Sequence, residues 1–89
     1  MNILSLNNSQ VITLAANAAT SSTAIQALNF RIVSQVGIHI AVGASPTATT
    51  STAYIPAGVI TQPISIGMGE RVNVLNATST AAAKVTLFY

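Results

Sequence analysis

Apolar residues recur at every second position along much of this chain, with small or polar residues between them. In the clearest run, the apolar side chains that fall on one side are Val36, Ile38, Ile40 and Val42. A period of two places alternate side chains on opposite faces of a β-strand, whereas an α-helix needs a period of about 3.6. The run therefore predicts a half-buried strand over residues 36–42, with His39 on the face opposite the core.

Other segments repeat this alternation more briefly. The predicted strands cover residues 11–14, 28–33, 71–75 and 83–89, with a weaker strand over residues 59–66. Pro63 has no N–H to donate to a neighbouring strand, so we expect the weaker strand to lie at a sheet edge or to break there. Residues 15–27 mix alanines with serines and threonines, which predicts an irregular loop with at most one helical turn.

Glycine, proline and small polar residues separate the predicted strands. The breaks are a long loop over residues 43–52, turns at 56–58 and 67–70, and a polar hairpin loop over 76–82. About five to seven short strands without a convincing helix are typical of an all-β domain. The pattern predicts a small antiparallel β-sandwich or barrel, jelly-roll-like in its arrangement.

A chain of 89 residues is long enough for one domain. We expect residues 1–89 to form a single β-sandwich, with its core strands within residues 28–89. Residues 1–10 are predicted to be either an N-terminal arm that pairs with a neighbouring subunit or a plain edge strand. The apolar side chains of this segment are Ile3, Leu4 and Leu6.

Charged side chains are unusually scarce. They make up 4% of the chain, against about 25% in an average soluble protein. A lone particle with so little charge tends to associate, and a small core without cross-links often gains stability from neighbouring subunits. The composition therefore predicts a homo-oligomeric subunit of a larger assembly.

The same scarcity argues against catalysis. The chain has no cysteine, His39 is its only imidazole, and Glu70 is its only side-chain carboxylate. Acid–base catalysis and metal binding both need several such groups in one place. We therefore expect no enzyme activity, no cofactor, no bound metal and no small-molecule substrate.

Two further partner classes are also not expected. The net charge of +2 comes from three dispersed cations, whereas nucleic-acid binding needs several clustered Lys and Arg contacts. A membrane-spanning helix needs about 20 predominantly apolar residues, and polar residues interrupt every segment of this chain. We predict neither a nucleic-acid partner nor a membrane span.

The few charged residues suggest contacts between subunits. Arg31 lies within a predicted strand and, if buried, needs a carboxylate or several carbonyl groups around it. Glu70 is the only side chain that can supply the carboxylate, so we expect an Arg31–Glu70 contact within or between subunits. Arg71 follows Glu70 directly and points to the opposite face, so the two cannot pair directly. Arg71 either keeps the strand edge soluble or forms a salt bridge with another subunit.

The aromatic residues leave two alternatives open. Tyr54 and Tyr89 either form a platform on which a sugar ring stacks or pack beneath turns. His39 has small neighbours on its face of the strand, which favours a surface or interface histidine.

The second half of the chain has a recognisable sequence of strands and turns: IAVGASPTAT at 40–49, YIPAG at 54–58, GERVNVL at 69–75 and AKVTL at 83–87. In these segments the chain resembles small virion proteins of tailed bacteriophages, in particular the capsid decoration, or cement, proteins. The resemblance covers about residues 28–89 and rests on strand and turn patterns.

This resemblance implies a β-sandwich subunit, a homotrimer, that binds the major capsid protein and stabilises the phage head. Such a protein is made in the host bacterial cytoplasm and lies on the capsid surface of the virion. The alternative is a host-glycan-binding module of a phage head spike, fibre or tail. The residues expected at an interface are Ile3, Leu4, Leu6, Arg31, Tyr54, Glu70 and Arg71.

Overall fold

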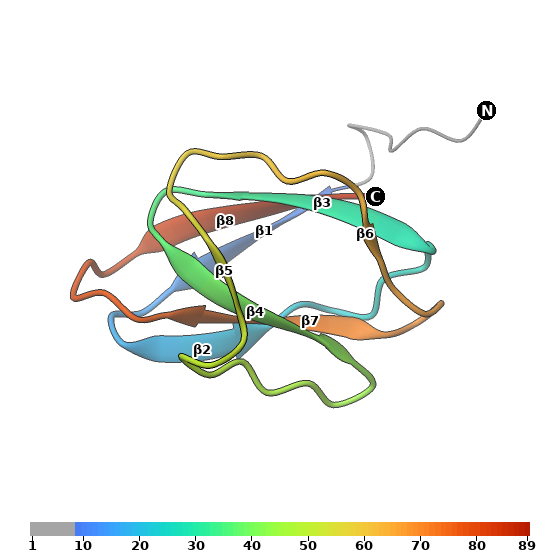
Figure 1. Ribbon diagram of the computed structural model, residues 1–89, viewed down its shortest axis with the longest axis horizontal. Helices are drawn as coiled ribbons and strands as arrows, with labels where there is room; N and C mark the ends of the chain where they lie inside the picture. Colours follow the sequence, from blue (N-terminus) through green and yellow to red (C-terminus); the bar gives the residue numbers. More distant parts are fainter. Residues whose placement is uncertain (1–8) are drawn as a thin grey trace.

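The computed structural model describes residues 9–89, which form two four-stranded antiparallel sheets packed face to face (Figure 1). Sheet I has the strand order β1-β8-β3-β6, and sheet II has the order β2-β7-β4-β5. The strand bounds are β1 (Ser9–Leu14), β2 (Ala18–Ser21), β3 (Asn29–Ser34), β4 (Ile38–Gly43), β5 (Ala53–Ile55), β6 (Ile64–Ser65), β7 (Arg71–Asn76) and β8 (Ala83–Phe88).

The strands pair in a nested order. β1 pairs with β8, β2 with β7, β3 with β6 and β4 with β5, as in one long hairpin folded across the chain. The β3–β8 and β4–β7 pairs then join this hairpin into two sheets. Eight strands in this order make a jelly roll. The predicted all-β, jelly-roll-like sandwich is therefore confirmed.

The inner faces of the two sheets supply the core, as the period-two pattern predicted. In β4, Ile38 and Ile40 are buried and Val42 packs against the core from its margin. Val36 also packs there but precedes the strand, which begins two residues later than predicted. The core residues are Ile12, Leu14, Ile25, Phe30, Ile32, Ile38, Ile40, Ile55, Ile66, Val72, Val74, Ala83, Val85 and Leu87. Full burial of one large aliphatic or aromatic side chain contributes about 1.5–3 kcal/mol.

Leu28 does not belong to this core, although the sequence pattern placed it there. Its side chain is 61% exposed because β3 begins only at Asn29. The Leu28 carbonyl accepts a hydrogen bond from the Ile66 N–H, which holds the backbone in the connection just before the strand. The predicted alternation over residues 28–33 is therefore wrong at its first position.

Residues 9–27 complete the sandwich, so the prediction that the core strands lie within residues 28–89 is wrong. Within the predicted loop over residues 15–27, β2 pairs with β7 and Ile25 is fully buried. Ser22 extends this pairing, because it exchanges hydrogen bonds with the backbone of Val72. Ser9 and Gln10 belong to β1. Ile3, Leu4 and Leu6, the proposed arm residues, lie outside the described residues.

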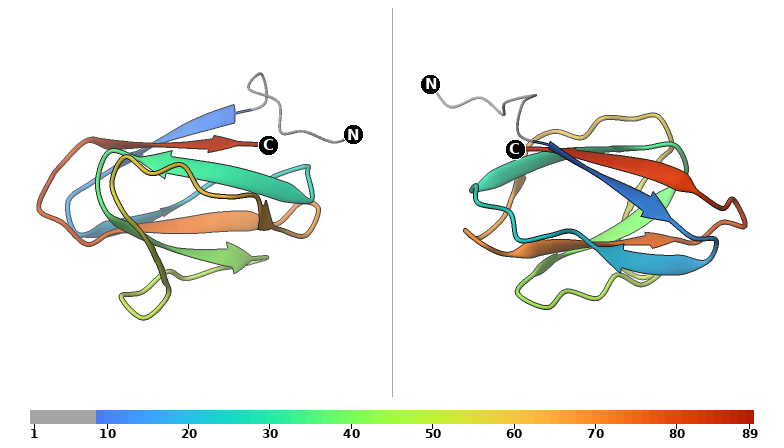
Figure 2. Two further views of the ribbon diagram at one scale, coloured as in Figure 1. Left: turned by 45° about the horizontal axis from the view of Figure 1, so that its top comes forward. Right: turned by 180° about the vertical axis from the view of Figure 1, so that it is seen from behind.

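Pro63 marks the break that the sequence predicted in the weak strand over residues 59–66. Only β6, which follows Pro63, is a strand, and it lies at the edge of sheet I. The preceding connection from β5 still follows β3, since Gly58 and Thr61 donate backbone hydrogen bonds to it. Figure 2 shows this connection passing from sheet II to sheet I.

The loop between β7 and β8 crosses from one sheet to the other, so the predicted hairpin over residues 76–82 is wrong. Asn76 is fully buried beneath this loop. Its side-chain Nδ2 donates to the carbonyls of Ala15 and Thr80, and its Oδ1 accepts from the N–H and hydroxyl of Thr78. One asparagine therefore ties the β1–β2 and β7–β8 connections together.

The assigned inner face of β4 makes a direct prediction. Ile40 is 6% exposed, so Ile40→Asp should abolish folding because it buries an unpaired carboxylate at a cost of several kcal/mol. Thr49→Asp, in an exposed loop, should be nearly silent. Thermal unfolding followed by circular dichroism measures both variants. A cooperative, wild-type-like transition for Ile40→Asp would show that the face is misassigned.

A second prediction concerns Ala82, whose φ of 57° lies in the left-handed region. That conformation costs a non-glycine residue about 1–2 kcal/mol, and glycine removes this cost. Glycine also makes the unfolded chain more flexible, which lowers the free energy of unfolding by a smaller amount. Ala82→Gly should therefore raise the free energy of unfolding by up to about 1 kcal/mol in urea titrations. Ala81→Gly, at a neighbouring position without positive φ, should lower it. An equal decrease in the free energy of unfolding in both variants would contradict the prediction.

Candidate interaction surfaces

The polar side chains most relevant to chemistry are engaged in local structure. His39 Nδ1 lies 3.0 Å from the Thr52 carbonyl oxygen. Since a carbonyl only accepts, Nδ1 carries the proton and Nε2 of the neutral ring is an acceptor. Glu70 Oε1 accepts the Gly67 N–H at 2.8 Å. Within residues 9–89, no three His, Cys, Asp or Glu side chains gather to hold a metal ion.

An aromatic row crosses the outer face of sheet II, and we call it the Tyr54 row. The strand register places Tyr54 of β5 beside His39 of β4, and His39 beside Leu75 of β7. The Tyr54 and His39 rings lie 5.1 Å apart at a tilt of 55°. Tyr54 is 59% exposed, and a Cβ on Gly37 would overlap its hydroxyl and ring. The glycine therefore lets the tyrosine lie against β4.

The β4–β5 loop covers part of this outer face at Asn73. Asn73 of β7 points away from the core, yet it is 91% buried because its Oδ1 accepts the Ala48 N–H at 2.8 Å. Its Nδ2 donates to the Ser21 hydroxyl on the neighbouring strand. The long loop predicted over residues 43–52 is thus fixed against sheet II, while the Tyr54 row and the outer side of β2 stay uncovered.

A second surface, the Arg31 face, lies on the outside of sheet I and comprises Val11, Arg31, Val33 and Phe88. The register places Arg31 of β3 beside Phe88 of β8, and Val33 shares a row with Val11 through Thr86. Arg31 is half-buried, and its Nε donates to the Thr61 carbonyl at 3.0 Å. Lys84, further along the sheet, donates to Thr13. The face combines apolar side chains with positive charge.

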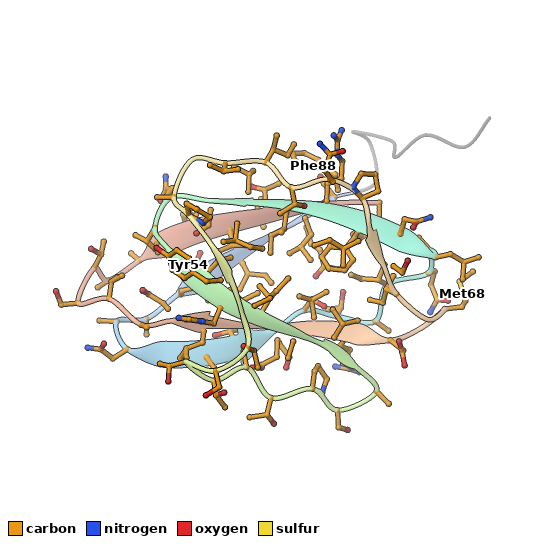
Figure 3. The ribbon with its side chains drawn as sticks, viewed as in Figure 1. Tyr54, Met68 and Phe88 are labelled. Atoms are coloured by element: carbon orange, nitrogen blue, oxygen red, sulfur yellow. The ribbon has the colours of Figure 1, made fainter. Side chains whose placement is uncertain are left out.

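A third surface lies at one end of the sandwich, and we call it the Met68 turn: Leu28, Met68 and Glu70. Gly69 adopts a φ of 81°, as the sequence allowed, so the chain turns tightly and leaves Met68 59% exposed. Leu28 is close by because its carbonyl accepts the Ile66 N–H. Figure 3 shows Met68 at this end, well away from Phe88 over sheet I and from Tyr54.

The structure does not bring the predicted interface residues into one site. Arg31, Tyr54 and Glu70 lie on the three separate surfaces. Arg71 is exposed at the start of β7, beside Gly43. Within the chain, Arg31 contacts Thr61 and Glu70 contacts Gly67, so the expected Arg31–Glu70 contact inside one subunit is wrong.

The two tyrosines also lie apart. Tyr54 belongs to sheet II, whereas Tyr89 packs against the core and its hydroxyl accepts a hydrogen bond from Gln10 Nε2 on β1. A joint sugar platform is therefore not formed. Sequence reasoning missed other exposed apolar side chains: Val11, Leu28, Val59, Ile60 and Met68. Of these, only Met68 could have been predicted to be exposed from the sequence, because it lies between two glycines in a tight turn.

Comparison with known proteins finds no match among protein-family models, curated proteins or solved structures. In the part of the chain that the structure describes, no helix is long and apolar enough to cross a membrane.

The close approach of Tyr54 to Gly37 can be tested directly. Gly37→Ala should displace the exposed tyrosine ring and break its contact with His39, at a stability cost within about 1 kcal/mol. The measurement is the change in the His39 ring proton shifts by NMR. Gly43→Ala, at the far end of β4 with open space around it, should leave those shifts unchanged. Unchanged shifts in Gly37→Ala would refute the arrangement.

Proposed function

We propose that this chain is a structural virion protein, a capsid decoration or cement subunit that binds the major capsid protein and stabilises a phage head. The observation that carries the proposal is the surface composition. Six large apolar side chains are 48% exposed or more in the described residues, whereas the whole chain has four charged side chains. Such a surface suits a subunit whose faces are covered by neighbours.

The fold supports the same proposal. Jelly rolls occur in viral capsid proteins and also in lectins and cupins, so the fold alone does not select a function. A cement protein needs stiffness and broad contact surfaces rather than a reactive centre. Val, Ile and Thr, the β-branched residues that suit strands, make up 29 of 89 residues. We propose a homotrimer on the capsid surface, without enzymatic activity, nucleic-acid binding or membrane attachment.

The test is binding to heads of the phage that encodes the chain. Purified protein is mixed with expanded heads and sedimented, and the bound copies per head are counted by quantitative gel analysis. The proposal predicts saturable binding at a fixed stoichiometry and greater resistance of the heads to heat. If the folded protein stays in the supernatant when the heads pellet, the proposal is contradicted.

A second candidate function, binding of a host glycan, is favoured by the Tyr54 row. An exposed tyrosine ring beside an imidazole acceptor offers a stacking surface and a hydrogen-bond partner for a sugar hydroxyl. A glycan-array screen compares the wild type with Tyr54→Ala and with Val11→Ala, an equally exposed control on sheet I. Glycan binding lost only in Tyr54→Ala would favour this function over the cement role.

A further inference from the structure

Arg31 has a guanidinium that is only partly satisfied within the chain. The side chain is half-buried on the outer face of sheet I. No side-chain nitrogen or oxygen of the described residues is both buried and without a hydrogen-bond partner, so the terminal NH₂ groups of Arg31 reach the surface. Among residues 9–89, its one hydrogen bond joins Nε to the Thr61 carbonyl. That contact fixes the guanidinium and leaves both terminal NH₂ groups for a planar acceptor such as a carboxylate.

Glu70 has the complementary deficit. One carboxylate oxygen accepts the Gly67 N–H, which fixes the side chain on the Met68 turn. Within the described residues the other oxygen has no hydrogen-bond partner, and Glu70 is the only side-chain carboxylate of the whole chain. Each group shares its surface with exposed apolar side chains: Met68 and Leu28 on the Met68 turn, and Val11 on the Arg31 face.

We propose that the Met68 turn of one subunit docks on the Arg31 face of a second copy, with Glu70 paired to Arg31 across the interface. The apolar side chains of the two surfaces then cover one another. The contact joins two different patches, so it can form twice across a two-fold axis or repeat head to tail, and the head-to-tail form closes into a ring when the rotation allows it. This contact between copies can form whether or not the protein binds a capsid.

Charge decides between this arrangement and a contact of two like surfaces. Two Arg31 faces in contact would oppose two Arg31 guanidinium groups without an acid between them. Two Met68 turns in contact would oppose two carboxylates. Buried or partly buried like charges cost several kcal/mol at an interface. Of these three arrangements, only the turn-to-face contact pairs Arg31 with Glu70.

The first experiment is a charge exchange read by analytical ultracentrifugation of the full chain. The wild type should sediment as an oligomer at micromolar concentrations, and Arg31→Glu should be monomeric. The Arg31→Glu/Glu70→Arg double variant should recover the oligomer. Lys84→Glu, which changes the net charge equally at an exposed site on the same sheet, should stay oligomeric.

Three outcomes would overturn the contact: a monomeric wild type, an oligomeric Arg31→Glu variant, or a folded double variant that stays monomeric. A folded state is established by its thermal unfolding transition. Should the double variant fail to fold, because Glu70 also accepts the Gly67 N–H, cysteine cross-linking decides instead.

The chain has no cysteine, so introduced thiols report only their own contacts. Arg31→Cys and Glu70→Cys are treated, separately and as a mixture, with a bis-maleimide whose spacer matches the combined length of the two replaced side chains, because a disulfide would need the two Cα atoms within about 7 Å. The proposal predicts a cross-linked dimer in the mixture and none in either variant alone. Cross-linking of one variant with itself indicates a contact of two like surfaces instead, and no cross-link in any sample excludes the contact. Either result overturns the proposal.

Discussion

The inner faces of the two sheets hold this chain together, because it has no disulfide to supplement them. Full burial of each aliphatic or aromatic side chain contributes about 1.5–3 kcal/mol, so a small core must use strands from the whole chain. Leu14 of β1 and Leu87 of β8 are both fully buried, and their strands pair along six residues. The nested strand order therefore makes both ends of the described chain part of one core.

With the core confined to the inner faces, the outer faces and connections are free to make contacts. They carry three different kinds of surface: an aromatic row around Tyr54, an apolar face with a fixed cation at Arg31, and an apolar turn with an acid at Glu70. Their separation favours a protein that touches several neighbours over one that gathers groups around a single ligand. A jelly roll serves many functions, so the surface chemistry has to support the proposal.

The sequence predicted strands well where apolar residues occupy every second position, as in β4 and β8. It missed β2, Ala18–Ser21, because alanine, threonine and serine give no contrast between buried and exposed positions. Pairing was less predictable, since nested contacts join strands far apart in sequence and the β7–β8 loop looked like a local hairpin. The partners of Arg31 and Glu70 were also missed, because each side chain forms one hydrogen bond with a backbone group and the two do not meet within the chain.

The central claim is that this chain works as one of many copies packed on a particle. Cryo-electron microscopy of the parent virion, with the chain carrying a density label, tests it most directly. The account predicts label density at regularly repeated positions on the outer surface of the head. Virions that lack the label altogether, or that carry it only at the tail tip, would contradict the account.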